Sequence, residues 1–267
     1  MRKIILPLIL ACIALYATAC SEKEEYGLCI ISSERTVGIN AGNFFPMHSV
    51  MKFPQALYVA DYLQKNDIPL DSAVVVRKDG LMPDTWSPML KEMGEEGVFS
   101  FRELLKLSLI ESDNNACDLL FQLFGMPEKV ESFVEGLGFK DIRILYTERQ
   151  MHDDISLAAE NCCTPLEMAR LLLWFNEHKD DNAYFREIWE IMSVCNTGKD
   201  RIPAAFGTDC SIIHKTGTGF TPVDGMPQMN DAGIVFRPDG QVLAIAVFVP
   251  HPASSTELAE IVKRNSD

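Results

Sequence analysis

The interpretation of this chain starts from one stretch, Phe45-Pro46-Met47-His48-Ser49-Val50-Met51-Lys52-Phe53. Ser49 and Lys52 stand three positions apart where a loop passes into a helical pattern, so a helix would place both side chains on one face. A serine hydroxyl is a weak nucleophile unless a nearby group takes its proton, and a lysine amine can do so when burial or neighbouring cations lower its pKa. A serine and a lysine at this spacing are common by chance. The pair becomes informative because Ser112-Asp113-Asn114 and Lys215-Thr216-Gly217 follow in order.

Composition places the chain among globular proteins. Its 267 residues are 47% hydrophobic and 23% charged, which suits one compact body or two interleaved lobes around a large core. The formal net charge of −14 excludes a surface built to bind nucleic-acid phosphates, since such a surface requires clustered lysine and arginine. We therefore expect no nucleic-acid partner.

The first nineteen residues have the pattern of an export signal. Arg2 and Lys3 precede an apolar run over residues 4–16, which is too short for a stable membrane span. The small residues 17–19 then precede Cys20, as at a bacterial lipoprotein cleavage site, although ordinary signal cleavage also fits them. We expect residues 1–19 to be removed, Cys20 to anchor the protein through a lipid, and residues 20–25 to form a tether. The predicted location is the cell envelope or periplasm.

Cysteine spacing gives no disulfide framework. Of eight cysteines, Cys12 and Cys20 lie in the export segment, and six cysteines could pair in 15 ways. Their spacing fits no zinc site, and isolated cysteines commonly pack as small apolar side chains. We expect mostly buried free thiols at the six positions that remain: Cys29, Cys117, Cys162, Cys163, Cys195 and Cys210.

Hydrophobic periodicity predicts strands near both ends of the chain and helices between them. A hairpin is expected over residues 26–39, and strands over residues 74–76, 211–216, 231–237 and 241–249. Helices are expected over residues 49–64, 100–110, 115–124, 128–137, 164–177, 183–194 and 256–263, with loops at 79–93 and 146–163. Capping signals support two of these helices, at Ser100 with Glu103 and at Thr164 before Pro165. The pattern implies an α/β lobe of residues 26–48 and 199–267, with a helical lobe of residues 49–198 inserted.

The three motifs together resemble those of the penicillin-recognising serine enzymes, and the aspartate of the second motif points to class A β-lactamases. The likeness covers roughly residues 26–262 and is closest in detail to an extended-spectrum subgroup. It implies a β-lactamase/transpeptidase-like fold with an antiparallel sheet flanked by helices and an all-helical insertion. The matching segments are residues 45–47, 85–88, 112–120, 147–152, 197–202 and 214–219.

This resemblance implies roles for the first two motifs. Ser49 is the nucleophile that becomes acylated, and Lys52 shares its proton network. Ser112 hands a proton to the departing lactam nitrogen, and Asn114 holds the side-chain amide of the substrate. Without the resemblance, Ser112 and Asn114 would be interpreted as a helix cap and a polar turn.

The third motif is implied to bind substrate. Lys215 orients Ser112 electrostatically and receives the substrate carboxylate together with Thr216 and Thr218, while Gly217 lies between them in the substrate-binding strand. The backbone N–H groups of Ser49 and Thr218 form the implied oxyanion hole.

Glu148 decides whether the enzyme is a hydrolase, because a serine ester persists unless a base activates water against it. The resemblance makes Glu148 that base; otherwise it would be one of 38 acidic residues. His152 stands where the family usually has an asparagine that positions this water. Tyr146 and Asn161 occupy the positions of the ion pair that usually closes this loop, so another network must hold Glu148.

Two further residues are implied to contact substrate. Arg201 stands where some relatives have an arginine that supplements carboxylate binding, and Trp86 is expected to line the mouth of the cleft. A surface arginine and a core tryptophan are the alternatives. His48 and His214 match structural positions of the family, and neither is expected to bind metal. No cofactor is implied.

The amino end departs from the family, which normally places a long helix there beside the closing helix. Only a few residues separate Cys20 from the first expected strand, and the closing helix is short. We therefore expect one face of the sheet to be partly uncovered, leaving an apolar patch.

The sequence thus predicts a serine hydrolase that opens small-molecule β-lactams through an acyl-enzyme, on both cephalosporins and penicillins. A cell-wall D,D-peptidase or penicillin-binding protein with the same three motifs is the alternative. A noncatalytic β-lactam sensor that stays acylated is a third reading. Glu148 favours the hydrolase over both.

Overall fold

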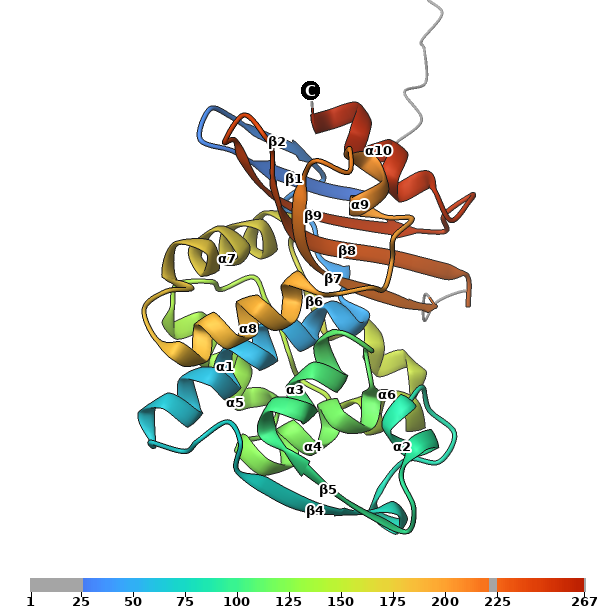
Figure 1. Cartoon of the computed structure of the whole chain (residues 1–267). Coiled ribbons are helices and arrows are strands. Elements are labelled where there is room, and N and C mark those ends of the chain that lie inside the picture. The colour runs from blue at the N-terminus through green and yellow to red at the C-terminus, as the bar shows by residue number, and fades with distance from the viewer. Residues whose placement is uncertain (1–25, 221–224, 267) are drawn as a thin grey trace, which may run out of the picture.

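The computed structural model describes residues 26–220 and 225–266. It places a sheet at one end of the molecule and a group of helices at the other (Figure 1). The expected export signal, the tether and Cys20 lie outside the described residues.

The main sheet is antiparallel and joins the two ends of the chain. Its strand order is β2-β1-β9-β8-β7, and Leu28 of β1 pairs with Val247 of β9. The bounds are β1 Gly27–Ile31, β2 Thr36–Ile39, β7 Ser211–Phe220, β8 Pro227–Phe236 and β9 Val242–Pro250. The expected antiparallel sheet is confirmed, with β7 and β8 longer than the predicted strands.

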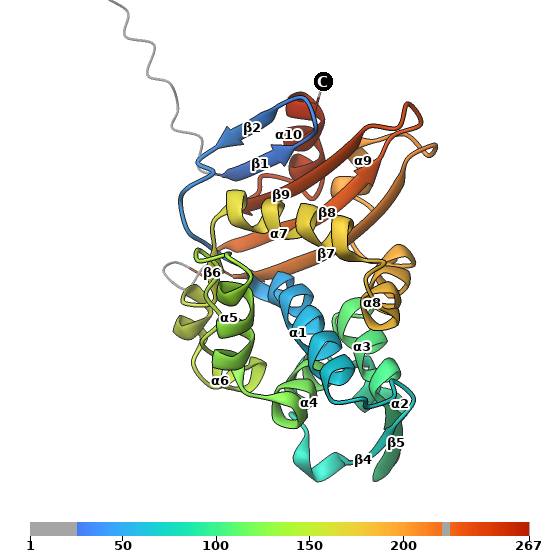
Figure 2. The same ribbon diagram turned by 90° about the vertical axis from the view of Figure 1, so that its left-hand side faces the viewer.

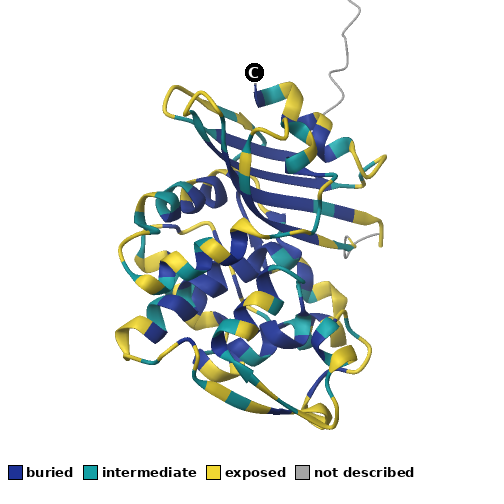
Figure 3. Ribbon diagram, viewed as in Figure 1, coloured by how far each residue is buried: buried dark blue, intermediate teal, exposed yellow. Residues whose placement is uncertain are grey.

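Helices cover both faces of this sheet (Figure 2). On one face lie α7 (Pro165–His178) and α8 (Ala183–Ser193), and on the other α9 (Ile202–Ala205) and α10 (Glu257–Ser266). Helix α1 (Lys52–Lys65) packs against α8. Strand β9 is accordingly buried almost throughout, as Figure 3 shows. Helix α7 belongs to residues 49–198, the expected helical lobe, yet it packs on the sheet. The expected division of the chain into a helical lobe and an α/β lobe therefore remains a prediction.

The expectation of an uncovered sheet face is wrong for the described residues. Leu28, Ile30 and Ile245 on the α10 side are at most 4% exposed and pack with Leu258 and Val262 of α10. The closing helix runs to Ser266, three residues past its predicted end. The apolar side chains of α10 therefore suffice to cover this side of β1 and β9.

The remaining helices surround α1, which is almost wholly buried along its first turns. Those in contact with α1 are α3 (Phe101–Leu109), α4 (Asn114–Phe124) and α5 (Pro127–Gly136). The predicted capping box is present: Ser100 accepts from the Glu103 N–H, and Glu103 accepts from the Ser100 N–H. Thr164 likewise caps α7, as predicted.

Strand β4 (Ala73–Arg77) contains the strand expected over residues 74–76. Several other short elements were not predicted. Strand β5 (Glu96–Ser100) pairs with β4, and the expected loop at residues 79–93 overlaps η2 (Lys78–Gly80) and contains α2 (Pro88–Glu92). The expected loop at 146–163 contains α6 (Glu148–Asp153), η3 (Ile155–Ala159) and β6 (Cys162–Cys163), which pairs with β3 (Phe45–Pro46). Segments this short lack a readable period, and tertiary contacts define them.

The cysteines of the described chain are free thiols, four of them buried, which confirms the expectation for these residues. In the same part of the chain, no helix is long and apolar enough to cross a membrane. Nor do residues 26–220 and 225–266 contain a cluster of three or more histidine, cysteine or acidic side chains suited to a metal ion.

Candidate active site

Ser49 lies in a 3₁₀ turn, η1 (His48–Met51), that leads directly into α1. Two side chains of β8 hold the approach to this turn. The Gln228 amide donates to the Pro46 carbonyl (2.9 Å), and the Asn230 amide donates to the Pro46 and Met47 carbonyls (2.9 and 3.1 Å). His48 has a φ of +48°, a conformation that costs energy in a residue with a side chain. The sheet therefore fixes a strained turn immediately before Ser49.

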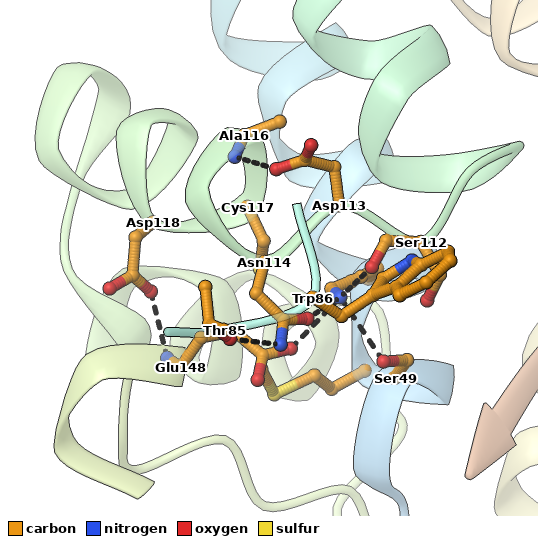
Figure 4. A network of polar contacts seen from close by, with 12 residues as sticks. Ser49, Thr85, Trp86, Ser112, Asp113, Asn114, Ala116, Cys117, Asp118 and Glu148 are labelled. Atoms are coloured by element: carbon orange, nitrogen blue, oxygen red, sulfur yellow. Dashed lines mark hydrogen bonds and ion pairs between the residues drawn. The ribbon is translucent and has the colours of Figure 1, made fainter. Parts of the chain in front are cut away.

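Lys52 joins the predicted nucleophile to the predicted base. Its ammonium is fully buried and lies 3.1 Å from Ser49 Oγ and 3.0 Å from Glu148 Oε1. It also donates to Asn114 Oδ1 (2.6 Å) and to the Ser112 carbonyl (2.9 Å). Figure 4 shows Ser49, Asn114 and Glu148 converging from three separate segments. A proton leaving Ser49 thus has a short route through Lys52 to a carboxylate.

The second motif forms a strained turn at the start of α4. Ser112 has a φ of +57°, and Asp113 rather than its neighbours caps the helix. Both Asp113 carboxylate oxygens accept from Ser87 Oγ (2.9 Å), while Asn114 Nδ2 donates to Thr85 Oγ1 (2.8 Å). These bonds hold Ser112 Oγ and the Asn114 amide toward the cleft. A helix cap and a polar turn alone would not explain this orientation of the two side chains.

Lys215 is fully buried and donates to Ser112 Oγ (3.0 Å) and to the Thr216 carbonyl (2.8 Å). Burial, and secondarily the nearby Lys52 charge, lower the pKa of Lys215 to about 7. Its ammonium therefore titrates in the physiological range and touches the hydroxyl of the second motif.

The glycines after Lys215 let β7 approach the residues just before Ser49. A Cβ on Gly217 would lie 2.5 Å from the Met47 carbonyl oxygen, and one on Gly219 would lie 2.3 Å from the His48 ring. Strand β7 is the last strand in the sheet order, and it packs directly against this turn. Only glycine at these positions allows the strand to pass so close to the residues preceding Ser49.

Arg201 is buried to 7% exposure and binds the same strand. Its guanidinium donates to the carbonyls of Gly217 (2.8 Å) and Asn230 (2.7 Å) and to Thr218 Oγ1 (2.5 Å). Arg201 thus supports β7 from within and is not the surface side chain of the alternative reading. It places a positive charge beside the cleft.

Glu148 opens α6, where Thr147 and Gln150 form a capping box. The carboxylate of Asp118 accepts from the Glu148 N–H (2.7 Å) and the Arg149 N–H (2.9 Å). Burial, followed by the Glu148 charge, raises the pKa of Asp118 to about 6. A carboxylate from α4 therefore holds the helix start from which Glu148 projects.

Asn161 supplies the network that replaces the usual closing ion pair. Its Oδ1 accepts from the N–H groups of Leu145 (2.8 Å) and Tyr146 (3.0 Å), and its Nδ2 donates to the Tyr146 carbonyl (2.7 Å). The Asn161 carbonyl in turn accepts from the Met47 N–H (2.8 Å). One fully buried amide therefore closes the loop and ties it to the segment before Ser49.

The remaining predicted residues lie at the rim. Trp86 is 56% exposed, with Nε1 bonded to the Glu111 carbonyl (2.8 Å) and Lys91 over its ring, so it lines the mouth and is not core. His152 Nε2 lies 3.2 Å from Asp84 Oδ1. This contact connects α6, which carries His152, to the segment just before Trp86.

Two hollows meet at Ser49. The larger, about 340 Å³, is lined by Ser49, Trp86, Glu111, Ser112, Asn114, Thr197, Gly198, Arg201, Thr216 and Thr218. The smaller, about 180 Å³, is lined by His48, Ser49, Thr85, Asn114, Glu148, Met151, His152, Ile155, Ala158, Thr218, Gly219 and Phe220. The predicted residues from all three motifs thus surround one serine.

Sequence reasoning missed the residues that support this site. Asp118 follows Asn114 by four positions on α4, so the two side chains lie near the same face of the helix. This spacing could have identified Asp118 as a neighbour of the site. Thr197, whose hydroxyl lies 3.1 Å from that of Thr216, was visible only as part of a matching segment. Nothing in the sequence indicated that Gln228 and Asn230 would reach across to the turn before Ser49.

Known proteins share both the sequence and the fold. Residues 14–267 match the model of the Beta-lactamase enzyme family. The chain is 33% identical to β-lactamase VEB-1 from Pseudomonas aeruginosa, over 90% of this chain and 82% of that protein. It is 30% identical to the extended-spectrum β-lactamase PER-1 from the same species, over 90% and 83%. Among solved structures, a β-lactamase from Chitinophaga pinensis superposes with a TM-score of 0.84 at 32% identity, covering 92% of this chain and 95% of that one.

A five-stranded antiparallel sheet, a helical region and a serine–lysine pair at their junction define a penicillin-recognising serine enzyme. With the family match and these relatives, the chain belongs to the β-lactamase enzyme family and is a class A serine β-lactamase. The resemblance inferred from the motifs is confirmed.

Proposed function

We propose that Ser49 opens β-lactams to form an acyl-enzyme and that water activated by Glu148 clears it. The observation that supports this assignment is the position of the Lys52 ammonium, 3.1 Å from Ser49 Oγ and 3.0 Å from Glu148 Oε1. One buried amine thereby connects the group that must lose a proton to the group that must accept one.

In the acylation step, Ser49 Oγ attacks the lactam carbonyl while its proton passes toward Lys52 and Glu148. The carbonyl oxygen gains negative charge, which the N–H groups of Ser49 and Thr218 stabilise in the transition state. Ser112 Oγ, which accepts from Lys215 Nζ, donates its proton to the departing lactam nitrogen. The lactam carbon–nitrogen bond breaks as the ester forms.

In the deacylation step, Glu148 takes a proton from water as that water attacks the ester, and Ser49 is regenerated. Oε1 of Glu148 is buried and lines the smaller hollow beside Ser49. A sensor or a penicillin-binding protein that stays acylated by β-lactams has no use for a carboxylate held here. The network from Asp118 and Asn161 therefore favours the hydrolase over both alternatives.

We propose that the substrates are cephalosporins and penicillins. The shared acid of these compounds suits the larger hollow, which Arg201, Thr216 and Thr218 line with a positive charge and hydroxyl donors. The buried Lys215 ammonium lies behind this wall and bonds the Thr216 carbonyl. Asn114 faces both hollows and is placed to hold the side-chain amide, with Trp86 and His152 at opposite rims.

Glu148→Gln tests the assignment of the base. The amide keeps the shape of the side chain but cannot accept the proton, and general-base catalysis contributes about 10²- to 10⁴-fold. Turnover of a chromogenic cephalosporin should fall by at least about 10²-fold, and mass spectrometry should find nearly one acyl group per chain. A variant as fast as the wild type would contradict the assignment, and a wild type that stays acylated would favour the sensor.

We also propose that the protein is exported and anchored at Cys20 through a lipid. The sequence pattern Ala17-Thr18-Ala19-Cys20 after an apolar run supports this proposal. A labelled fatty acid fed to expressing cells should mark the wild type and miss Cys20→Ser. Equal labelling of both proteins would exclude lipidation at this residue.

A further inference from the structure

Asp84 and His152 join two elements that border the smaller hollow. His152 Nε2, on α6, lies 3.2 Å from Asp84 Oδ1, in the segment before α2. His152 lines this hollow beside Glu148, and so does Thr85, the residue after Asp84. The contact therefore connects the helix that carries the proposed base to a second segment of the same site.

The segment that carries Asp84 is fixed to the second motif. Thr85 Oγ1 accepts from Asn114 Nδ2 (2.8 Å), as Figure 4 shows, and the Trp86 carbonyl accepts from the Asn114 N–H (3.0 Å). The two residues that follow Asp84 are thus bonded to a side chain and a main chain of the active site. Asp84 therefore presents its carboxylate from an anchored position.

Helix α6 is held at both ends by carboxylates. Asp118 accepts from the Glu148 N–H at its start (2.7 Å), and Asp84 meets His152 near its end. His152 follows Glu148 by four positions, so the two side chains lie on one face of the helix. Within residues 26–220 and 225–266, Asp84 is the only hydrogen-bond or ion-pair partner of the His152 ring. Its loss would leave the ring without a polar contact to that part of the chain.

This contact also sets which ring nitrogen carries a proton. An ionised carboxylate only accepts hydrogen bonds, so His152 Nε2 donates to Asp84. In a neutral imidazole, the other nitrogen, Nδ1, then carries a lone pair and accepts. Asp84 thus fixes both the orientation and the tautomer of a ring that lines the hollow beside Glu148.

We propose that Asp84 is a positioning residue for deacylation and that it acts through His152. The inference rests on the proposed function, in which Glu148 activates the deacylating water. Glu148 takes one proton as the water oxygen attacks the ester carbon, while Nδ1 of His152 accepts a hydrogen bond from the other. The ester carbon–oxygen bond breaks, and Ser49 Oγ recovers the transferred proton. Acylation does not use this water, so Asp84 should affect only the second half-reaction.

Asp84→Ala tests the role in a cephalosporin assay that separates the two half-reactions. Decay of the acyl-enzyme, followed by mass spectrometry, should slow about three- to fivefold, the size of effect that an exposed ion pair supports. The value of kcat/KM, which does not contain the deacylation step, should stay unchanged, and so should the Tm. Loss of folded protein would instead lower kcat and kcat/KM equally. That result, or decay at the wild-type rate, would overturn the proposal.

Asp79 offers a matched control in the same loop. Its side chain is 74% exposed against 73% for Asp84, but its ion pair is with Arg77 Nε (3.4 Å) and not with α6. Asp79→Ala should therefore keep the wild-type decay rate. Asp84→Asn keeps an acceptor for Nε2 and should stay within about twofold of the wild type. Equal slowing by Asp79→Ala and Asp84→Ala would contradict a specific role for Asp84.

A double-mutant cycle tests whether Asp84 acts through the ring. His152→Ala should slow deacylation by itself, and adding Asp84→Ala should slow it no further, because the ring is already absent. Additive losses would overturn the proposed connection.

The base assignment is checked separately by Glu148→Gln. If that variant accumulates acyl-enzyme while Asp84→Ala decays at the wild-type rate, this inference fails and the proposed function stands. Turnover of Glu148→Gln at the wild-type rate would overturn both.

Discussion

The two sides of the active site are built differently. The strand wall, residues 215–219 of β7, belongs to the main sheet and is fixed by Arg201, Asn230 and close glycine contacts. The loop wall, residues 146–161, contains only short elements and is held by Asn161 and Asp118. The groups proposed for acylation line the strand wall and the helix junction, whereas the proposed base for deacylation stands on the loop wall. The two half-reactions should therefore respond separately to substitutions.

The largest effect should come from Ser49, the residue common to both hollows. Ser49→Ala removes the only hydroxyl bonded to Lys52 Nζ among the described residues, so acylation has no nucleophile. Covalent labelling by a penicillin should disappear from the intact-mass spectrum. Ser112→Ala is the control and should label slowly but to the same stoichiometry. Unchanged labelling of Ser49→Ala would contradict the assignment of the nucleophile.

Asn161 tests the loop wall alone. Asn161→Ala leaves the Leu145 and Tyr146 N–H groups without their buried acceptor, which should cost about 1–3 kcal/mol per group and lower the Tm. The proposed base should lose its position, so deacylation should slow at least about tenfold while burst acylation stays near that of the wild type. Asn161→Asp keeps the acceptor and should recover part of both losses. Equal slowing of the two half-reactions would show that the walls are coupled.

The smallest effect concerns pH and the strand wall. Lys215 has a pKa lowered to about 7 by burial and by Lys52, so it loses its proton as the pH rises through that value. The charge proposed to bind the substrate carboxylate then falls, and kcat/KM, which reports the free enzyme, should drop about tenfold between pH 6 and pH 8.5. Lys215→Arg keeps its charge and should show a flatter profile. An identical decline in both proteins would exclude Lys215 as its source.

Sequence alone determined the site chemistry because that information is local. The spacing of Ser49 and Lys52, the cap signals at Ser100 and Thr164, and the strong periodicity of the long helices each depend on a few neighbouring residues. The order of the three motifs then identified the class of enzyme. Strands were predicted near both ends of the chain, and this placement also indicated that the two ends form one sheet.

Only the tertiary structure decided how the site is supported. Asn161 binds Tyr146 across fifteen residues, Asp118 binds Glu148 across thirty, and Asn230 reaches the Met47 carbonyl across 183. No periodicity or motif records such contacts, because they depend on where packed helices and strands place distant side chains. The same reason applies to the coverage of the sheet by α10, which no single segment could show. The sequence determined which groups are candidates for the reaction, and the packing of the fold determined what holds them in place.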